Sequence, residues 1–258
     1  MNRKIITAFV FFALAAVVSA QDAASIVEQS RNRIKADTVS TRSRMIITAK
    51  NGTATERVMD QYSKKDAQGN ARTVVVFQDP ASVRGSRFLT IENSGKEKDQ
   101  WIFLPSLGKI RRIAASEGSG SFMGSDFSYD DISSTDRKTD QDNHKILRTE
   151  KFNGKDCYVI ESSSKDANYQ YSKMIQWIDV TSLVIYKIEL YDRRGTQVKL
   201  LEITEYREVQ GRLAPYVTKM TTLADGTSTS INVVNLKYDD PIPEGVFTTR
   251  FLETGRYQ

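Results

Sequence analysis

The chain has 258 residues, with 37 lysines and arginines against 32 aspartates and glutamates, one histidine and one cysteine. Of the formal net charge of +5, two positive charges come from Arg3 and Lys4 at the extreme N-terminus, so the remainder gives no support to nucleic-acid binding. One histidine and one cysteine argue against zinc sites of the usual kinds and exclude an intrachain disulfide, so we expect no metal, no cofactor and a fold that is stabilised by its core alone.

The first twenty residues have the layout of a secretory signal peptide. Two basic residues precede an apolar run from Ala8 to Val18, and Val18-Ser19-Ala20 forms a small-residue cleavage site. The run is too short to span a membrane comfortably, and no cysteine near the cleavage site could carry a lipid anchor. We therefore predict a signal peptide over 1–20, cleaved after Ala20, and a single exported, periplasmic domain over 21–258.

The first mature segment is the best helix candidate. Asp22 is a residue type that commonly caps a helix N-terminus, and the pattern predicts a helix from there to about Lys35. A helix this short needs a surface to pack on, and the sheet that follows is the only candidate. The residues that share one face of this helix are Ala23, Ile26, Val27, Ser30 and Ile34.

From Thr41 onward the pattern changes to short β runs separated by turns. Three dipeptides typical of type I′ hairpins connect neighbouring runs, namely Asn51-Gly52, Asn153-Gly154 and Asp225-Gly226. Consecutive hairpins indicate an antiparallel meander within one domain. The runs are 44–49, 56–62, 73–77, 87–91, 100–104, 109–114, 145–152, 156–162, 171–179, 184–191, 198–206, 216–223 and 230–238. In the tenth run, alternation predicts one shared apolar face for Val184, Tyr186, Ile188 and Leu190.

The segment from Asp99 to Asp131 joins an apolar strand, a basic turn and a loop rich in glycine and serine. Gly118, Gly120 and Gly124 loosen the backbone around large side chains that a free loop would not expose, so we expect this segment to line or cover an apolar cavity. Plain core packing explains Trp101 and Phe103 nearly as well, whereas the loop at 121–124 favours a gate. The candidate cavity or lid residues are Trp101, Phe103, Leu104, Phe122, Met123, Phe127 and Tyr129.

The turn within this segment carries the cationic residues Lys109, Arg111 and Arg112. Exposed charge on a hairpin is the default interpretation, and the functional alternative is a contact with acidic lipid head groups or an acidic partner surface. Strand alternation places Arg111 and Arg112 on opposite faces, so at most one of them points inward.

The same segment resembles a known family. The run QWIFLPSLGKIRRI, followed by SFMGSDFSYDD and preceded by PASVRGSRFL, is similar to the outer-membrane lipoprotein-sorting proteins of the LolA/LolB-like superfamily, in particular to its larger periplasmic branch. The quoted motifs span about Pro80 to Asp131. The resemblance implies an unclosed antiparallel barrel that encloses helices and an apolar cavity for acyl chains. We accordingly predict an α+β fold, a half-barrel of about ten or eleven strands wrapped around one or two helices.

The function that follows is noncatalytic: a periplasmic carrier that binds and transfers a lipid or a lipoprotein acyl moiety toward or from the outer membrane. The implied partners are an inner-membrane transporter of the resistance-nodulation-division type and an outer-membrane acceptor. One alternative is an accessory subunit of such a transporter that never holds lipid. A second alternative is a hydrolase acting through Asp126 and Asp130, which lacks an accompanying base because His144 lies in a polar run typical of a surface loop.

Overall fold

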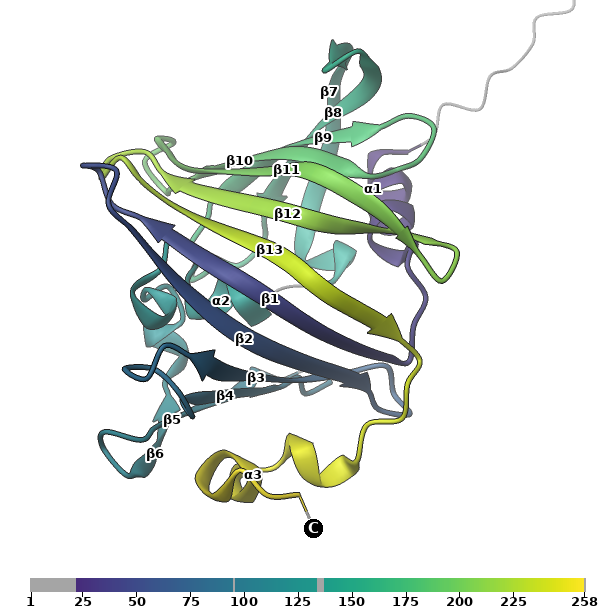
Figure 1. The fold of residues 1–258 in the computed structure, drawn as a ribbon. Helices are drawn as coiled ribbons and strands as arrows, with labels where there is room; N and C mark the ends of the chain where they lie inside the picture. The colour runs from purple at the N-terminus through teal and green to yellow at the C-terminus, as the bar shows by residue number, and fades with distance from the viewer. Residues whose placement is uncertain (1–21, 95, 134–136, 258) are drawn as a thin grey trace, which may run out of the picture.

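The computed structural model describes residues 22–94, 96–133 and 137–257 (Figure 1). The predicted signal peptide and its cleavage site lie outside these described residues. Within them, no helix combines the length and the apolar character that crossing a bilayer requires.

The described chain forms one unclosed antiparallel sheet of 13 strands, in the spatial order β6-β5-β4-β3-β2-β1-β13-β12-β11-β10-β9-β8-β7. The predicted half-barrel is confirmed as an unclosed antiparallel sheet. The predicted number of ten or eleven strands was too low, because each of the predicted β runs forms a strand. The α+β class was also wrong, since the helices are few and short and the fold is mostly β. The strands are β1 (Thr38–Thr48), β2 (Ala54–Lys65), β3 (Ala71–Asp79), β4 (Arg87–Ile91), β5 (Asp99–Leu104), β6 (Lys109–Ile113), β7 (Asp142–Phe152), β8 (Lys155–Ser164), β9 (Lys173–Asp179), β10 (Ile185–Tyr191), β11 (Gln197–Val209), β12 (Arg212–Thr222) and β13 (Thr227–Tyr238).

Tight turns connect most neighbouring strands. The three predicted hairpins are present as β1–β2, β7–β8 and β12–β13. Only Asn153-Gly154 has positive φ at both turn positions (49° and 79°), as a type I′ turn requires. Gln210-Gly211, between β11 and β12, has positive φ at both positions as well (49° and 72°), although glutamine is not a residue type that predicts such a turn.

The predicted N-terminal helix is confirmed as α1 (Ala23–Asn32), three residues shorter at its end than expected. Its buried residues are the predicted ones, Ala23, Ile26, Val27 and Ser30. They pack on the inner face of the sheet, where Ile160 of β8 and Ile178 of β9 are fully buried beneath the helix. Figure 1 shows α1 and α2 (Tyr129–Ser133) on the concave side of the curved sheet.

The C-terminal residues cover part of the outer face of the sheet. A 3₁₀ turn, η5 (Glu244–Phe247), and helix α3 (Thr249–Thr254) lie against β3 to β6. Phe247 and Leu252 pack there over Leu89 and Trp101, which point away from the concave side. This outer cover was not foreseen from the sequence, because a four-residue and a six-residue element are too short to show a helical period.

A β-bulge corrects one face assignment. The register between β9 and β10 shifts between Ile185 and Lys187. Ile188 and Leu190 consequently face the inside, whereas Tyr186 packs on the outer face beside Trp177. The prediction that Tyr186 shares their face was therefore wrong, because an extra residue in one strand inverts the alternation that precedes it.

Candidate functional site

The chain between the edge strands β6 and β7 runs along the inner face of the sheet. We call its residues 114–133 the crossing segment. It contains two 3₁₀ turns, η1 (Ala115–Glu117) and η2 (Phe122–Gly124), followed by α2. A further 3₁₀ turn, η4 (Thr139–Gln141), leads into β7. The segment contacts both halves of the concave side of the sheet.

Phe122 anchors the crossing segment to the first half of the sheet. Its side chain is fully buried, with its ring centroid 5.2 Å from that of Phe88, 5.8 Å from Phe77 and 5.7 Å from Tyr129. Cross-strand pairing extends this apolar surface, because Val75 pairs with Phe88, which in turn pairs with Ile102. The other buried members of this first inner cluster are Met45, Met59 and Ile113.

Phe127 anchors the segment to the second half. It lies against Tyr171, Leu190 and Met220, which come from the loop before β9, from β10 and from β12. Ile132 of α2 contacts both this second inner cluster and the first one. The crossing segment thus fills the interior along its length with its own apolar side chains.

A buried carboxylate ties the segment to the β12–β13 hairpin. Asp126, only 7% exposed, accepts hydrogen bonds from the hydroxyls of Thr222 (2.6 Å), Thr227 (2.5 Å) and Thr229 (2.6 Å). The Asp126 backbone N–H donates to Thr229 Oγ1 at 2.9 Å. Four hydrogen bonds therefore fix one residue of the segment to the rim of the barrel.

A second carboxylate ties the segment to β11 and to the loop before β9. Asp131 accepts from Lys199 Nζ at 3.1 Å and from the hydroxyl of Tyr171 at 3.1 Å. Burial, followed by the charge of Asp131, raises the pKa of Tyr171 far above its usual value, so its phenol remains a neutral donor. On the other side of the segment, Lys98 Nζ lies 2.8 Å from Asp130 Oδ1. Arg57 donates to the carbonyl oxygen of Met123, and burial lowers the pKa of its guanidinium.

The structure divides the predicted cavity residues between the two faces of the sheet. Leu104, Met123 and Tyr129 join Phe122 at the first inner cluster, and Phe127 lies in the second. Trp101 and Phe103 instead face the outside, beneath η5 and α3. Five of the seven residues are thus brought together on the concave side, and two lie on the convex side under the C-terminal cover.

The predicted basic turn lies on the edge strand β6. The guanidinium of Arg111 donates to Glu117 at 2.6 Å, which raises its pKa, and Arg112 pairs with Asp99. Ile110 lies in the outer cluster and Ile113 in the first inner cluster, so the two arginines point to opposite faces as alternation predicts. Lys109 is exposed at the start of the strand. All three cations remain at the surface of one edge.

The groups considered for catalysis have structural partners. Both ring nitrogens of His144 lie within hydrogen-bond distance of protein oxygens, Ser162 Oγ and the Thr139 carbonyl, each at 2.8 Å. Asp126 and Asp130 are held as described above. In the described part of the chain, no group of three or more His, Cys, Asp and Glu side chains could hold a metal ion.

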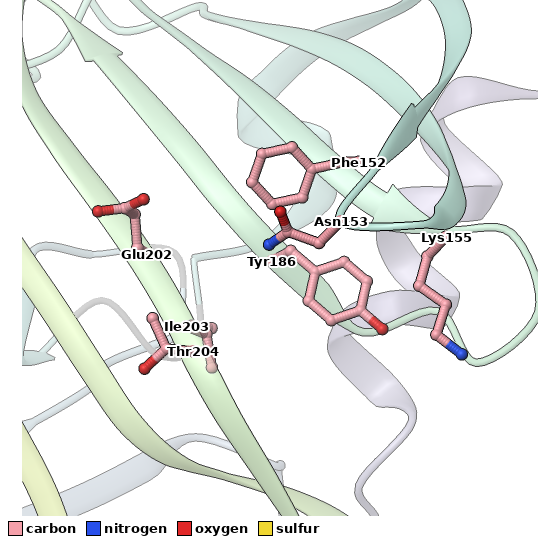
Figure 2. Close-up of a pocket in the computed structure, with 7 residues that line it drawn as sticks. All are labelled: Phe152, Asn153, Lys155, Tyr186, Glu202, Ile203 and Thr204. Atoms are coloured by element: carbon pink, nitrogen blue, oxygen red, sulfur yellow. The ribbon is translucent and has the colours of Figure 1, made fainter.

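Cavities open at the surface of the described residues on both faces of the sheet. The mouth cavity, of about 530 Å³, lies between the β1–β2 hairpin, the β12–β13 hairpin and the crossing segment. A smaller one of about 250 Å³ lies on the outer face near the β7–β8 turn (Figure 2), where the rings of Phe152 and Tyr186 stand 6.3 Å apart beside Glu202. The sequence indicated neither, because the mouth cavity is lined mostly by hydroxyl side chains from distant hairpins, and serine and threonine in isolation carry no pattern.

The fold and the interior place the chain among the LolA-like proteins, with the fold of outer membrane lipoprotein-sorting proteins. A DUF1329 family protein from Desulfovibrio piger is 26% identical, with a TM-score of 0.85, over 89% of this chain and 97% of that one. A domain from Vibrio parahaemolyticus named as an outer membrane lipoprotein-sorting protein is 28% identical, with a TM-score of 0.84, over 90% of this chain and 98% of that one. A LolA superfamily protein from Nitrosomonas europaea, at 22% identity and a TM-score of 0.71 over 89% and 98% of the two chains, shares the fold.

A sequence model of a protein family, described as 'Uncharacterized protein', matches residues 69–254 of the chain. The chain belongs to this family, since the match covers well over half of its length. A comparison with the curated proteins found no match.

Proposed function

We propose that this protein is a periplasmic carrier that binds the acyl chain of a lipid or lipoprotein on the concave face of its sheet, in exchange for the crossing segment. The observation that carries the proposal is the interior itself. An apolar surface from β1–β6 and β9–β13 is covered by a connection that crosses it without joining the sheet. Lifting that connection would expose one continuous apolar trough.

The free energy gained by burying an acyl chain is comparable to the free energy lost when Phe122 leaves its packing. Burying an acyl chain contributes about 0.8 kcal/mol per CH₂ group. Removing a fully buried phenylalanine from its packing costs about 3–5 kcal/mol, so Phe122 is matched by about four to six CH₂ groups. A lipid chain longer than that can displace Phe122 and still gain free energy from the rest of its length.

The proposed location and partners follow from the resemblance and the N-terminal sequence. The export signal over 1–20 would deliver the protein to the periplasm, an inner-membrane transporter would supply the cargo, and an outer-membrane acceptor would receive it. The basic edge around Arg111 and Arg112 is a candidate contact for an acidic partner surface or acidic lipid head groups.

The test is lipid extraction from protein purified without detergent from the periplasm of its own host, followed by mass spectrometry. We expect acyl lipids in stoichiometric amounts, and a fluorescent fatty-acyl probe should bind the delipidated protein in competition with them. Absence of both copurified lipid and probe binding would contradict the proposal.

One observation favours a second candidate, an accessory subunit of the transporter that never holds lipid. The concave face is already covered by Phe122, Phe127 and Tyr129, and its large side chains Phe77, Phe88 and Met45 are buried in the absence of a ligand. Retention of the protein on its transporter after complete delipidation, with no probe binding, would support this candidate instead.

A further inference from the structure

Two lysines outside the crossing segment are neutralised by carboxylates that belong to it. Lys98, just before β5, has its Nζ 2.8 Å from Asp130 Oδ1, and Lys199 of β11 has its Nζ 3.1 Å from Asp131 Oδ2. The two lysine side chains are only 28% and 16% exposed. Near Lys98, the carboxylate of Asp99 is already held by an arginine and an asparagine. Departure of the segment would therefore remove both counter-charges and leave two cations at the trough.

Hydrogen-bond donors lie beside Lys98 on the inner face. Lys98 Nζ and Gln100 Nε2 both donate to the hydroxyl oxygen of Ser133 in α2, at 2.7 Å and 2.9 Å, so they converge on a position that opens when the segment leaves. Thr90 of β4 is the Cα partner of Gln100, and directly paired residues point to the same face. It is 3% exposed, and its hydroxyl has no hydrogen-bond partner among the residues that the structure describes. A buried hydroxyl without a partner is unusual, and a ligand at this position would supply one.

The strands that carry these donors continue into the apolar part of the trough. Phe88 lies two residues before Thr90 on β4, and Ile102 lies two residues after Gln100 on β5. Both belong to the first inner cluster. Residues two apart on a strand share a face and are separated by about 7 Å, so the donors adjoin the apolar surface directly. This arrangement suits a ligand with a polar head and an apolar chain.

We propose that the cargo is an anionic lipid, whose carboxylate or phosphate binds Lys98, Gln100 and Thr90 once the acyl chain has displaced the crossing segment. This inference rests on the proposed function, because the three side chains become available only when the segment leaves. Lys199 adds positive charge from the other half of the sheet. An uncharged lipid would leave both lysines without a counter-charge beside an apolar chain, which is unfavourable, whereas an anionic head group replaces the carboxylate that was lost.

Three ligands with chains of the same length test the inference: laurate, dodecyl phosphate and 1-monolauroylglycerol. Each competes with a fluorescent fatty-acyl probe at mildly alkaline pH, where laurate is ionised. We expect at least one anion to bind about tenfold more tightly than the uncharged monoglyceride, the equivalent of one hydrogen bond to a charged group, and the tighter anion identifies the head group. All three ligands need the same open segment, so the ratio of anion affinity to monoglyceride affinity does not depend on how easily the segment opens.

Two variants remove parts of the site. Lys98→Gln should lower this affinity ratio about fivefold or more. Thr90→Val removes a hydroxyl that has no partner in the closed protein, so it should leave Tm unchanged or raise it, and should still lower the ratio about threefold. Because Thr90→Val preserves the shape of the side chain, it tests the site by itself if Lys98→Gln does not fold.

The matched control is Lys219→Gln, which removes the same charge from the outer face of β12, since the next residue, Met220, lies in the second inner cluster. Lys219 is exposed, and its variant should leave the affinity ratio unchanged. Equal binding of anions and monoglyceride to the unmodified protein, or a ratio that the Lys98 and Thr90 variants leave unchanged, would overturn the head-group site while leaving the carrier function standing. Failure of all three ligands to bind would overturn the two proposals together.

Discussion

Truncation of Phe122 separates a movable cover from a fixed core. Phe122→Ala removes a fully buried ring that contacts the rings of Phe77, Phe88 and Tyr129. The cost of such a truncation is about 3–5 kcal/mol. If the crossing segment opens as a unit, the substitution lowers the free energy difference between its open and closed states by this amount. The fraction of molecules with an open segment then rises about a hundredfold to several thousandfold.

Hydrogen exchange measured peptide by peptide reports directly on the fraction of molecules in which a segment is open. Amides of the crossing segment should lose protection in Phe122→Ala, whereas the strands β8 and β9 should keep theirs. Affinity for an acyl probe should increase, because a ligand that needs the open state binds with an affinity reduced by the fraction of molecules that are open. A carrier with a weakened cover is thus expected to bind more tightly than the unmodified protein.

The control is Leu89→Ala, a fully buried side chain of β4 that faces the outer cover. Its truncation costs about 2–5 kcal/mol, but it should accelerate exchange without singling out the crossing segment and should leave probe affinity unchanged. If Phe122→Ala instead raised exchange evenly over the whole chain and left probe affinity as it was, Phe122 would belong to the global core and the exchange mechanism would be refuted.

Three further changes probe other parts of the molecule. Asp126→Asn weakens the acceptor of three threonine hydroxyls, so we expect a loss of about 1–3 kcal/mol and faster limited proteolysis within residues 119–133. The hydrogen bond from Lys64 lowers the pKa of Glu244, so this carboxylate stabilises the fold above its usual pKa and loses that contribution as the pH falls through the lowered value. Glu244→Gln should accordingly reduce the drop in Tm on acidification, whereas the same change at exposed Glu208 should not. Burial raises the pKa of the Cys157 thiol, so a thiol reagent should label the native protein far more slowly than the unfolded chain, and equal rates would show that β8 is not buried as described.

The strands were predictable because their signals are local. Hairpin turns and alternating apolar residues located every strand, and the helical period of Ala23, Ile26 and Val27 located α1 together with its buried face. The same alternation placed Arg111 and Arg112 on opposite faces. It could not say which face of β5 meets the crossing segment, because Trp101 and Ile102 are both apolar and the cover over Trp101 comes from the distant C-terminus.

The site was predictable only where a residue conflicted with its local setting. Phe122 and Phe127 stood out because large rings lie among glycines and serines, and both prove to be buried on the concave side. The partners of Asp126 could not be foreseen, since nothing nearby in sequence shows that three threonines about a hundred residues away would surround it. Tyr186 was misplaced for a related reason, because a bulge depends on the register with a partner strand and leaves no mark in the strand's own sequence.

A cover made of the protein's own side chains also bears on how cargo would be released. In an open, empty trough the acyl chain would be held by its full burial free energy, about 0.8 kcal/mol per CH₂ group, and would leave slowly. Phe122 and Phe127 would compete with the lipid for the same surface, and each would regain its own packing as the lipid departs. The free energy that holds the cargo would therefore be only the difference between the lipid-filled state and the self-filled state. The polar ties at Asp126 and Asp131 reform at the same time, and they give the closed state a defined position. A self-filling interior therefore lowers affinity and favours release to an acceptor, which is what transfer between two membranes demands of a carrier.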